Sequence, residues 1–241
     1  MKKHIPNAIT SMNLLCGVIG VIFAMNGRVD TAFLLMLAAA ACDFCDGLAA
    51  RLLNAYSPVG KELDSLADVV SFGVLPALIL YQLMSYQVRG WLTCIPLVFA
   101  VFAALRLAKF NIDERQHDTF LGLPAPAAAM ICGSLAYYVY HEPFTVLAQG
   151  CGTVWFIPAV ALVLSLLMVS EIPMFTLKFG GKSQADLVTR FGRIAILCMA
   201  VIAVIIALVA RLNWSMAILM TLVAYLLVNL VFWIFPATRQ K

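Results

Sequence analysis

The sequence predicts an all-α membrane protein, a single polytopic bundle of about eight transmembrane helices over residues 1–241 with both termini cytoplasmic. Three observations predict this class. Hydrophobic residues make up 63% of the chain and charged residues only 12%, which excludes a water-soluble globular domain. The apolar residues form long stretches separated by short polar connections. Lysine and arginine, in addition, are concentrated in alternate connections.

The first four apolar stretches, taken in order, are each long enough to supply the roughly 20 residues that a helix needs to cross a bilayer. We expect the first to be a retained helix and not a signal peptide, because Asn7 and Asn13 are too polar for the apolar region of a signal peptide and no clear small-x-small cleavage site follows. The second and third are separated by the helix breakers Pro58 and Gly60, which predict a tight hairpin. These four stretches cover residues 8–26, 31–54, 60–84 and 90–110.

The last four stretches are bounded by similar signals. Gly122 and Pro124 mark the start of the fifth, Pro173 follows the sixth, and Pro236 follows the eighth. A two-residue connection at Leu212 separates the seventh from the eighth. The stretches cover residues 122–140, 154–170, 192–211 and 214–235.

The distribution of positive charge predicts the orientation. With eight helices, the termini and every second connection share one side, and that side carries 13 of the 16 lysines and arginines. The positive-inside rule makes this side cytoplasmic. The opposite side has Arg28, Arg89 and Arg211. The net charge of +4 therefore reflects topology and attraction to anionic membrane lipids, and not nucleic-acid binding. The cytoplasmic set is Lys2, Lys3, Arg51, Lys61, Arg106, Lys109, Arg115, Lys178, Lys182, Arg190, Arg193, Arg239 and Lys241.

Four aspartates stand out in this apolar chain: Asp43, Asp46, Asp64 and Asp68. An ionised carboxylate in such surroundings costs several kcal/mol unless it is paired or binds a cation. The spacings of three and four residues place each pair on one helix face, and a hairpin around Pro58 would bring the two faces together. A cluster of oxygen ligands without His or Cys favours Mg²⁺ or Mn²⁺ over zinc, and two such ions would suit phosphoryl transfer.

The motif around these aspartates resembles the signature of the CDP-alcohol phosphotransferase family. Its pattern is Asp-x2-Asp-Gly-x2-Ala-Arg-x8-Gly-x3-Asp-x3-Asp, over residues 43–68. All the fixed positions are present: Asp43, Asp46, Gly47, Ala50, Arg51, Gly60, Asp64 and Asp68.

The resemblance implies a role for each residue. Two divalent cations, Mg or Mn, would be held by the aspartates, the first by Asp43, Asp46 and Asp64 and the second by Asp43, Asp64 and Asp68. Asp68 would also be the general base that accepts the proton of the acceptor hydroxyl, and CMP would leave. The donor, a CDP-lipid, would be bound by Asn7, Thr10, Gly47, Ala50, Arg51 and Gly60.

The acceptor is predicted from three further stretches that resemble membrane-type phosphatidylserine synthases, a branch of this family. They begin at Leu63, Leu105 and Phe120. The resemblance implies CDP-diacylglycerol and L-serine as substrates and a homodimer formed by the later helices. Arg106 and Lys109 would bind the serine carboxylate, although both residues are also placed to anchor a helix at the headgroup level.

Other functions remain open at this point. The same chemistry with glycerol 3-phosphate, inositol or choline is the main alternative. A cation-coupled transporter is a second, but it predicts acids near the bilayer midplane and inverted repeats, whereas these acids crowd one interface. The expected location is a bacterial cytoplasmic membrane, with the active site facing the cytoplasm.

Overall fold

The computed structural model describes residues 4–86, 90–112, 120–174 and 187–234, with the side chains of residues 120, 187–197 and 232 left aside. Its regular structure is almost entirely helical. The first half contains α1 (His4–Met25), α2 (Val29–Leu52), α3 (Pro58–Val69), the π-helical turn η1 (Val70–Val74), α4 (Leu75–Ser85), the 3₁₀ segment η2 (Trp91–Leu97) and α5 (Val98–Ile112). The second half contains β1 (Phe120–Leu121), α6 (Ala125–His141), α7 (Val146–Cys151), α8 (Phe156–Val169), β2 (Pro173–Met174), α9 (Leu187–Val209) and α10 (Trp214–Ile234).

All eight predicted apolar stretches form helix in the structure. The third corresponds to α3, η1 and α4, which together run from Pro58 to Ser85. Five segments in the described residues are long and apolar enough to cross a membrane, so the chain is an integral membrane protein. They are α1, α2, α3–α4, η2–α5 and α10. Helices α6 and α8, with 17 and 14 residues, are shorter than this limit.

Three features depart from the sequence expectation. The connection before Thr153 contains the short helix α7, which begins where the Thr145 hydroxyl accepts a hydrogen bond from the Ala148 N–H. A two-stranded antiparallel ladder of two residues per strand pairs Phe120 with Met174 in a fold that is otherwise helical. The π-helical turn, finally, interrupts what the sequence suggests is one uniform helix.

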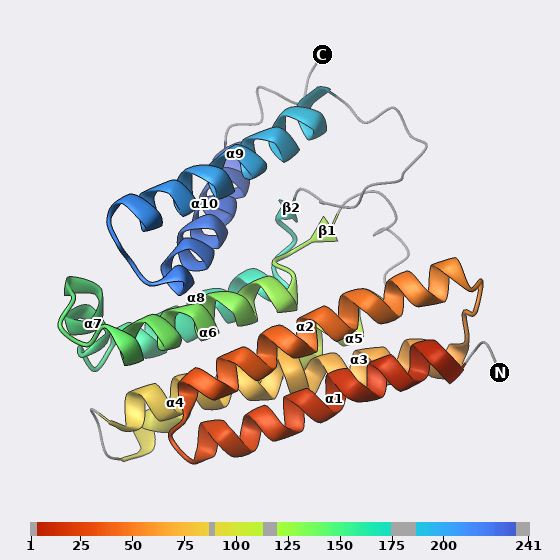
Figure 1. The fold of residues 1–241 in the computed structure, drawn as a ribbon, viewed down its shortest axis with the longest axis horizontal. Helices are drawn as coiled ribbons and strands as arrows, with labels where there is room; N and C mark the ends of the chain where they lie inside the picture. The colour runs from red at the N-terminus through yellow and green to blue at the C-terminus, as the bar shows by residue number, and fades with distance from the viewer. Residues whose placement is uncertain (1–3, 87–89, 113–119, 175–186, 235–241) are drawn as a thin grey trace.

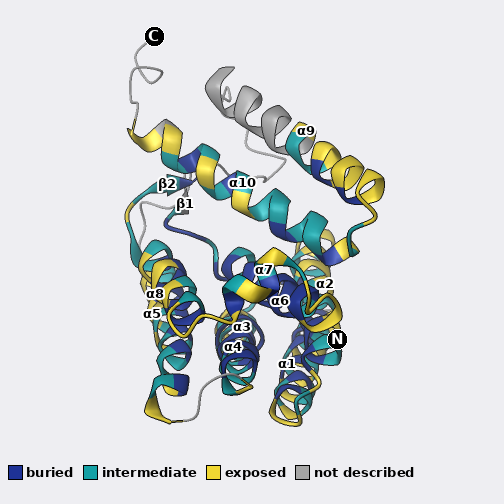
Figure 2. Cartoon of the chain, turned by 90° about the vertical axis from the view of Figure 1, so that its left-hand side faces the viewer, coloured by how far each residue is buried: buried dark blue, intermediate teal, exposed yellow. Residues whose placement is uncertain are grey.

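The helices are arranged as a bundle with a peripheral hairpin. Figure 1 shows α1 and α2 side by side, with α3, α4 and α5 behind them, and with α6 and α8 between these helices and the α9–α10 hairpin. Helix α10 packs against α6, and α9 packs against α10. Buried residues concentrate on α4 and α6 in the middle of the bundle, whereas α9 shows a largely exposed face (Figure 2). Such apolar exposure is expected for a surface that contacts lipid.

Helix α3 begins at a well-formed cap. The hydroxyl of Ser57, the N-cap residue, accepts a hydrogen bond of 3.0 Å from the Gly60 N–H, and Pro58 occupies the first helical turn. The preceding Asn54 adopts a positive φ of 49°, which turns the chain sharply after α2. These local preferences produce the hairpin that packs α3 against α1 and brings carboxylates of α3 near Asp43 of α2.

Candidate functional site

Three of the four aspartates converge where α2 meets α3. Asp43, Asp64 and Asp68 each contribute one carboxylate oxygen to a group whose members all lie within 4.8 Å of one another. Asp43 and Asp64 are half-buried, and Asp68 is only 9% exposed. The helical spacing and the hairpin therefore bring together carboxylates from two helices, as the sequence predicts for these three residues.

Asp46 lies beside this group and makes an additional contact with α1. It is buried on α2, and its Oδ2 accepts a hydrogen bond of 2.6 Å from the Thr10 hydroxyl of α1. The group of three carboxylates does not include it. Its predicted place in a metal site stays a prediction, while the contact with Thr10 shows that it also connects α2 to α1.

The three-carboxylate group fits a divalent cation. Every donor in it is a carboxylate oxygen, which is the ligand type that Mg²⁺ and Mn²⁺ prefer. The Oδ1 atom of Asp64 is buried and has no hydrogen-bond partner among the described residues. Carboxylates this close repel one another strongly when ionised, so a cation would relieve both the repulsion and the unsatisfied oxygen.

A cavity of about 240 Å³ adjoins the carboxylates. It is formed by the start of α1, the end of α2 and the start of α3. All six residues that were predicted to bind the CDP-lipid line it: Asn7, Thr10, Gly47, Ala50, Arg51 and Gly60. Asp46, Asp64 and Lys61 also line it, so the cavity combines acidic and basic groups.

The glycine at position 60 is required by close packing. A Cβ atom there would lie 2.8 Å from Asn7 Oδ1 and 2.9 Å from Ser57 Oγ. Both distances are shorter than real Cβ contacts, so a side chain at this position would displace the ends of the Asn7 and Ser57 side chains, which line the cavity. Gly60 therefore allows α1 and α3 to approach each other at this point.

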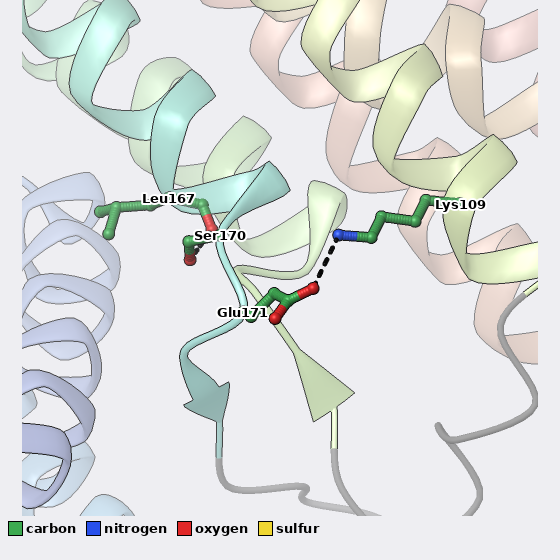
Figure 3. A network of polar contacts seen from close by, with 4 residues as sticks. All are labelled: Lys109, Leu167, Ser170 and Glu171. Carbon is green, nitrogen blue, oxygen red and sulfur yellow. Dashed lines mark hydrogen bonds and ion pairs between the residues drawn. The ribbon is translucent and has the colours of Figure 1, made fainter.

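The two basic residues of α5 have different environments. Arg106 is 7% exposed, its guanidinium lies 5.5 Å from the ring centroid of Phe110, and its Nε has no hydrogen-bond partner in the described structure. Its guanidinium interacts electrostatically with Asp68. Lys109 instead points away toward Glu171, with 3.5 Å between Nζ and Oε1 (Figure 3). Arg106 therefore lies near Asp68, whereas Lys109 forms its ion pair with Glu171.

Sequence reasoning did not assign a role to two residues that lie near this site. Asn13 of α1 donates a hydrogen bond of 3.2 Å from Nδ2 to Asp68 Oδ1. Its position three residues after Thr10, on the same helix face, is the only sequence signal for it. Tyr225 of α10 interacts electrostatically with Arg106, and no local pattern indicates this contact.

Comparison with known proteins gives a consistent result. A model of the CDP-alcohol phosphatidyltransferase family matches residues 3–167. The chain is 36% identical over 170 residues to the CDP-diacylglycerol–serine O-phosphatidyltransferase of Bacillus subtilis, an alignment that covers 70% of this chain and 89% of that protein. The corresponding protein of Mycobacterium tuberculosis strain H37Rv is 39% identical over 180 residues, covering 70% of this chain and 60% of the relative.

A third relative differs in its name. The archaetidylserine synthase of Methanothermobacter thermautotrophicus is 32% identical over 132 residues, which cover 54% of this chain and 56% of that protein. The chain therefore spans most of the Bacillus subtilis relative, but less than two thirds of the length of the mycobacterial and archaeal relatives. All three alignments, like the family model, cover more than half of this chain.

Proposed function

The chain belongs to the CDP-alcohol phosphatidyltransferase family, and we propose that it transfers the phosphatidyl group of CDP-diacylglycerol to the hydroxyl of L-serine. The products are phosphatidylserine and CMP. The observation that carries this proposal is the group of Asp43, Asp64 and Asp68 beside a cavity, in a chain 36% identical to a serine O-phosphatidyltransferase.

The aspartates would hold the divalent cations. Asp43, Asp64 and Asp68 are the residues whose geometry supports this directly, and Asp46 completes the predicted set of four ligands for two Mg²⁺ or Mn²⁺ ions. When bound, these ions neutralise the pyrophosphate and make CMP a better leaving group. The chain's own contribution is to hold the carboxylates in place on two rigid helices.

Asp68 is the proposed general base. It takes the proton from the serine hydroxyl while that oxygen attacks the phosphorus that carries the lipid. The bond between this phosphorus and the CMP oxygen breaks, and the electron pair leaves with CMP. Asp68 suits this task because it is the most deeply buried of the three grouped carboxylates and lies near the Arg106 guanidinium.

The nucleotide is proposed to occupy the cavity between α1, α2 and α3. Small residues at Gly47 and Ala50 leave room beside the backbone, and Arg51 supplies a positive charge for phosphate. The cavity volume of about 240 Å³ is smaller than that of a pocket for an entire ligand of drug size. We therefore propose that the cavity receives only part of the CDP-lipid, with the acyl chains in the surrounding lipid.

Replacing Gly60 with alanine is expected to weaken donor binding. The added Cβ would push Asn7 away from the cavity wall, which should raise the KM for CDP-diacylglycerol about tenfold and leave the KM for serine unchanged. Steady-state kinetics with each substrate varied in turn measures this. Gly150→Ala is the matched control, because its Cβ meets open space. Equal effects of the two substitutions would contradict the assignment.

The serine carboxylate is proposed to bind at Arg106. The unpaired Nε leaves one donor of this guanidinium available for an anionic group, and the interaction with Asp68 places that donor near the proposed base. Lys109 was predicted to share this role. It would contribute only after releasing Glu171, so Arg106 is the principal candidate.

Arg106→Ala is expected to raise the KM for serine roughly 10–100-fold, because a charge-assisted hydrogen bond is lost, with a much smaller change in the KM for CDP-diacylglycerol. Arg106→Lys, which keeps the charge but not the planar fork, should give an intermediate value. Both KM values are measured from CMP release. If the two rise equally in Arg106→Ala, the carboxylate assignment is wrong.

The membrane arrangement is part of the proposal. We infer eight spans with both termini cytoplasmic, the site facing the cytoplasm of a bacterial inner membrane, and a homodimer formed through the later helices. The segregation of positive charge supports the orientation. Labelling of single cysteines placed in successive connections, in intact cells and in lysed cells, tests it. Chemical cross-linking in membranes tests the dimer.

The function itself is tested with the purified protein. CMP release is measured with CDP-diacylglycerol, Mg²⁺ or Mn²⁺, and serine, glycerol 3-phosphate, inositol or choline in turn. Serine is expected to give the fastest release, and another preferred alcohol would overturn the acceptor. CDP-archaeol in place of CDP-diacylglycerol tests the donor lipid. If no CMP is released with any alcohol, whether or not metal is present, the transporter interpretation is favoured instead.

A further inference from the structure

We infer that Asn13 is a positioning residue that sets the orientation of the Asp68 carboxylate. Its Nδ2 donates a hydrogen bond of 3.2 Å to Asp68 Oδ1 across 55 residues of sequence. Asn13 is 0% exposed and Asp68 is 9% exposed, so water does not compete strongly for this bond. The inference rests on the proposed function, in which Asp68 is the base.

The hydrogen bond from Asn13 restricts rotation of the Asp68 carboxylate, and this rotation determines where the oxygen atoms of a base lie. A carboxylate rotates easily about the bond to its Cβ atom, because this torsion has a broad energy profile. A directed bond to Oδ1 limits that rotation and so determines where the second oxygen, Oδ2, lies. A base must lie within hydrogen-bond reach of the proton it accepts, and a misplacement of about 1 Å reduces rates by roughly 10²-fold.

Asn13 is itself held in place by the segment that follows Asp68. The Ser71 hydroxyl, in the π-helical turn, donates a hydrogen bond of 3.2 Å to the Asn13 carbonyl oxygen. One turn further along α1, a Cβ at Gly17 would collide with Ser71 Oγ and lie 3.1 Å from Ser71 Cα. Asn13 and Gly17 therefore face the turn after Asp68, and the amide approaches the carboxylate from a fixed backbone.

The other end of the amide is unsatisfied. Asn13 Oδ1 is buried and has no hydrogen-bond partner among the described residues. A buried amide that served only to join two helices would be expected to have both ends paired. An unpaired buried oxygen beside the proposed base is typical of a functional position, since such sites accept a cost in stability for a defined geometry.

The inference is tested with three variants of the full-length protein, assayed by CMP release with Mn²⁺ and the alcohol that gives the fastest reaction. Asn13→Ala is expected to lower kcat roughly 10–100-fold while the KM for CDP-diacylglycerol stays within about twofold. Asn13→Asp, which is nearly isosteric but places a second carboxylate against Asp68, should lose more. Ser11→Ala is the control, because Ser11 is exposed on the same helix and bonds only to the Asn7 carbonyl oxygen.

Two further measurements separate positioning from folding. The thermal unfolding midpoint and Mn²⁺ binding, followed by electron paramagnetic resonance, should be nearly unchanged in Asn13→Ala when its kcat has fallen. A kcat within about twofold of wild type, or a KM for CDP-diacylglycerol that rises as much as kcat falls, overturns the inference. A wild-type preference for an alcohol other than serine overturns the proposed acceptor alone. Absence of CMP release with every alcohol overturns both.

Discussion

Asp68→Asn is expected to lower turnover on the order of 10³-fold while metal and CDP-diacylglycerol binding remain largely intact. Asparagine keeps the size of the side chain and one oxygen, but its amide cannot accept a proton at neutral pH. The remaining grouped carboxylates, Asp43 and Asp64, stay in place on α2 and α3. The measurement is single-turnover CMP release at saturating donor, together with Mn²⁺ binding.

Glu62→Gln is the matched control for this prediction. Glu62 lies on the same helix as Asp68 but is exposed to solvent, so the loss of its charge should not change the rate. Near-normal activity of Asp68→Asn would remove Asp68 as the base. A complete loss of Mn²⁺ binding would instead show that the residue acts chiefly as a ligand.

Asp64→Asn is expected to raise the metal concentration needed for half-maximal activity roughly 10–100-fold and to reduce the rate at saturating metal as well. Asp64 belongs to the carboxylate group and also lines the cavity, so it lies between the proposed metal and nucleotide sites. Its buried Oδ1 has no partner among the described protein atoms, which suits a ligand shared by two ions. Titration with Mn²⁺, read by activity and by direct binding, measures both effects.

The control for Asp64→Asn is Asp30→Asn. Asp30 lies in the first turn of α2, the helix whose opposite end carries Asp43, and should have no influence on metal binding. An unchanged metal titration in Asp64→Asn would argue against a shared ligand. A reduced rate with the same metal dependence would point to a role in donor binding alone.

The helices themselves were largely predictable from the sequence. Hydrophobicity and helix breakers are local properties, and all eight apolar stretches form helix, with the α2–α3 hairpin at Pro58 as expected. The π-helical turn after Asp68 and the pairing of Phe120 with Met174 were not predicted. Both depend on contacts between segments distant in sequence, such as the bond from Ser71 to Asn13.

The candidate site was predictable to a similar extent. The spacing of three and four residues placed Asp43, Asp64 and Asp68 on facing helix surfaces, and the structure brings these three together. The same argument treats Asp46 as their equivalent, which stays a prediction, and it does not show that Asp46 accepts a hydrogen bond from Thr10. Periodicity gives the direction of a side chain on its own helix, but it does not show which neighbouring helix supplies a partner.

The sequence by itself determined the class of the protein, the helical segments and the candidate residues for the chemistry, because composition, periodicity and motif spacing are all readable along one chain. Only the tertiary structure decided how α1 completes the site, through Thr10 at Asp46 and Asn13 at Asp68. It also separated Arg106, buried near Asp68, from Lys109, paired with Glu171. These pairings depend on the rotation and approach of helices packed against one another, which many side chains set jointly and no local pattern encodes.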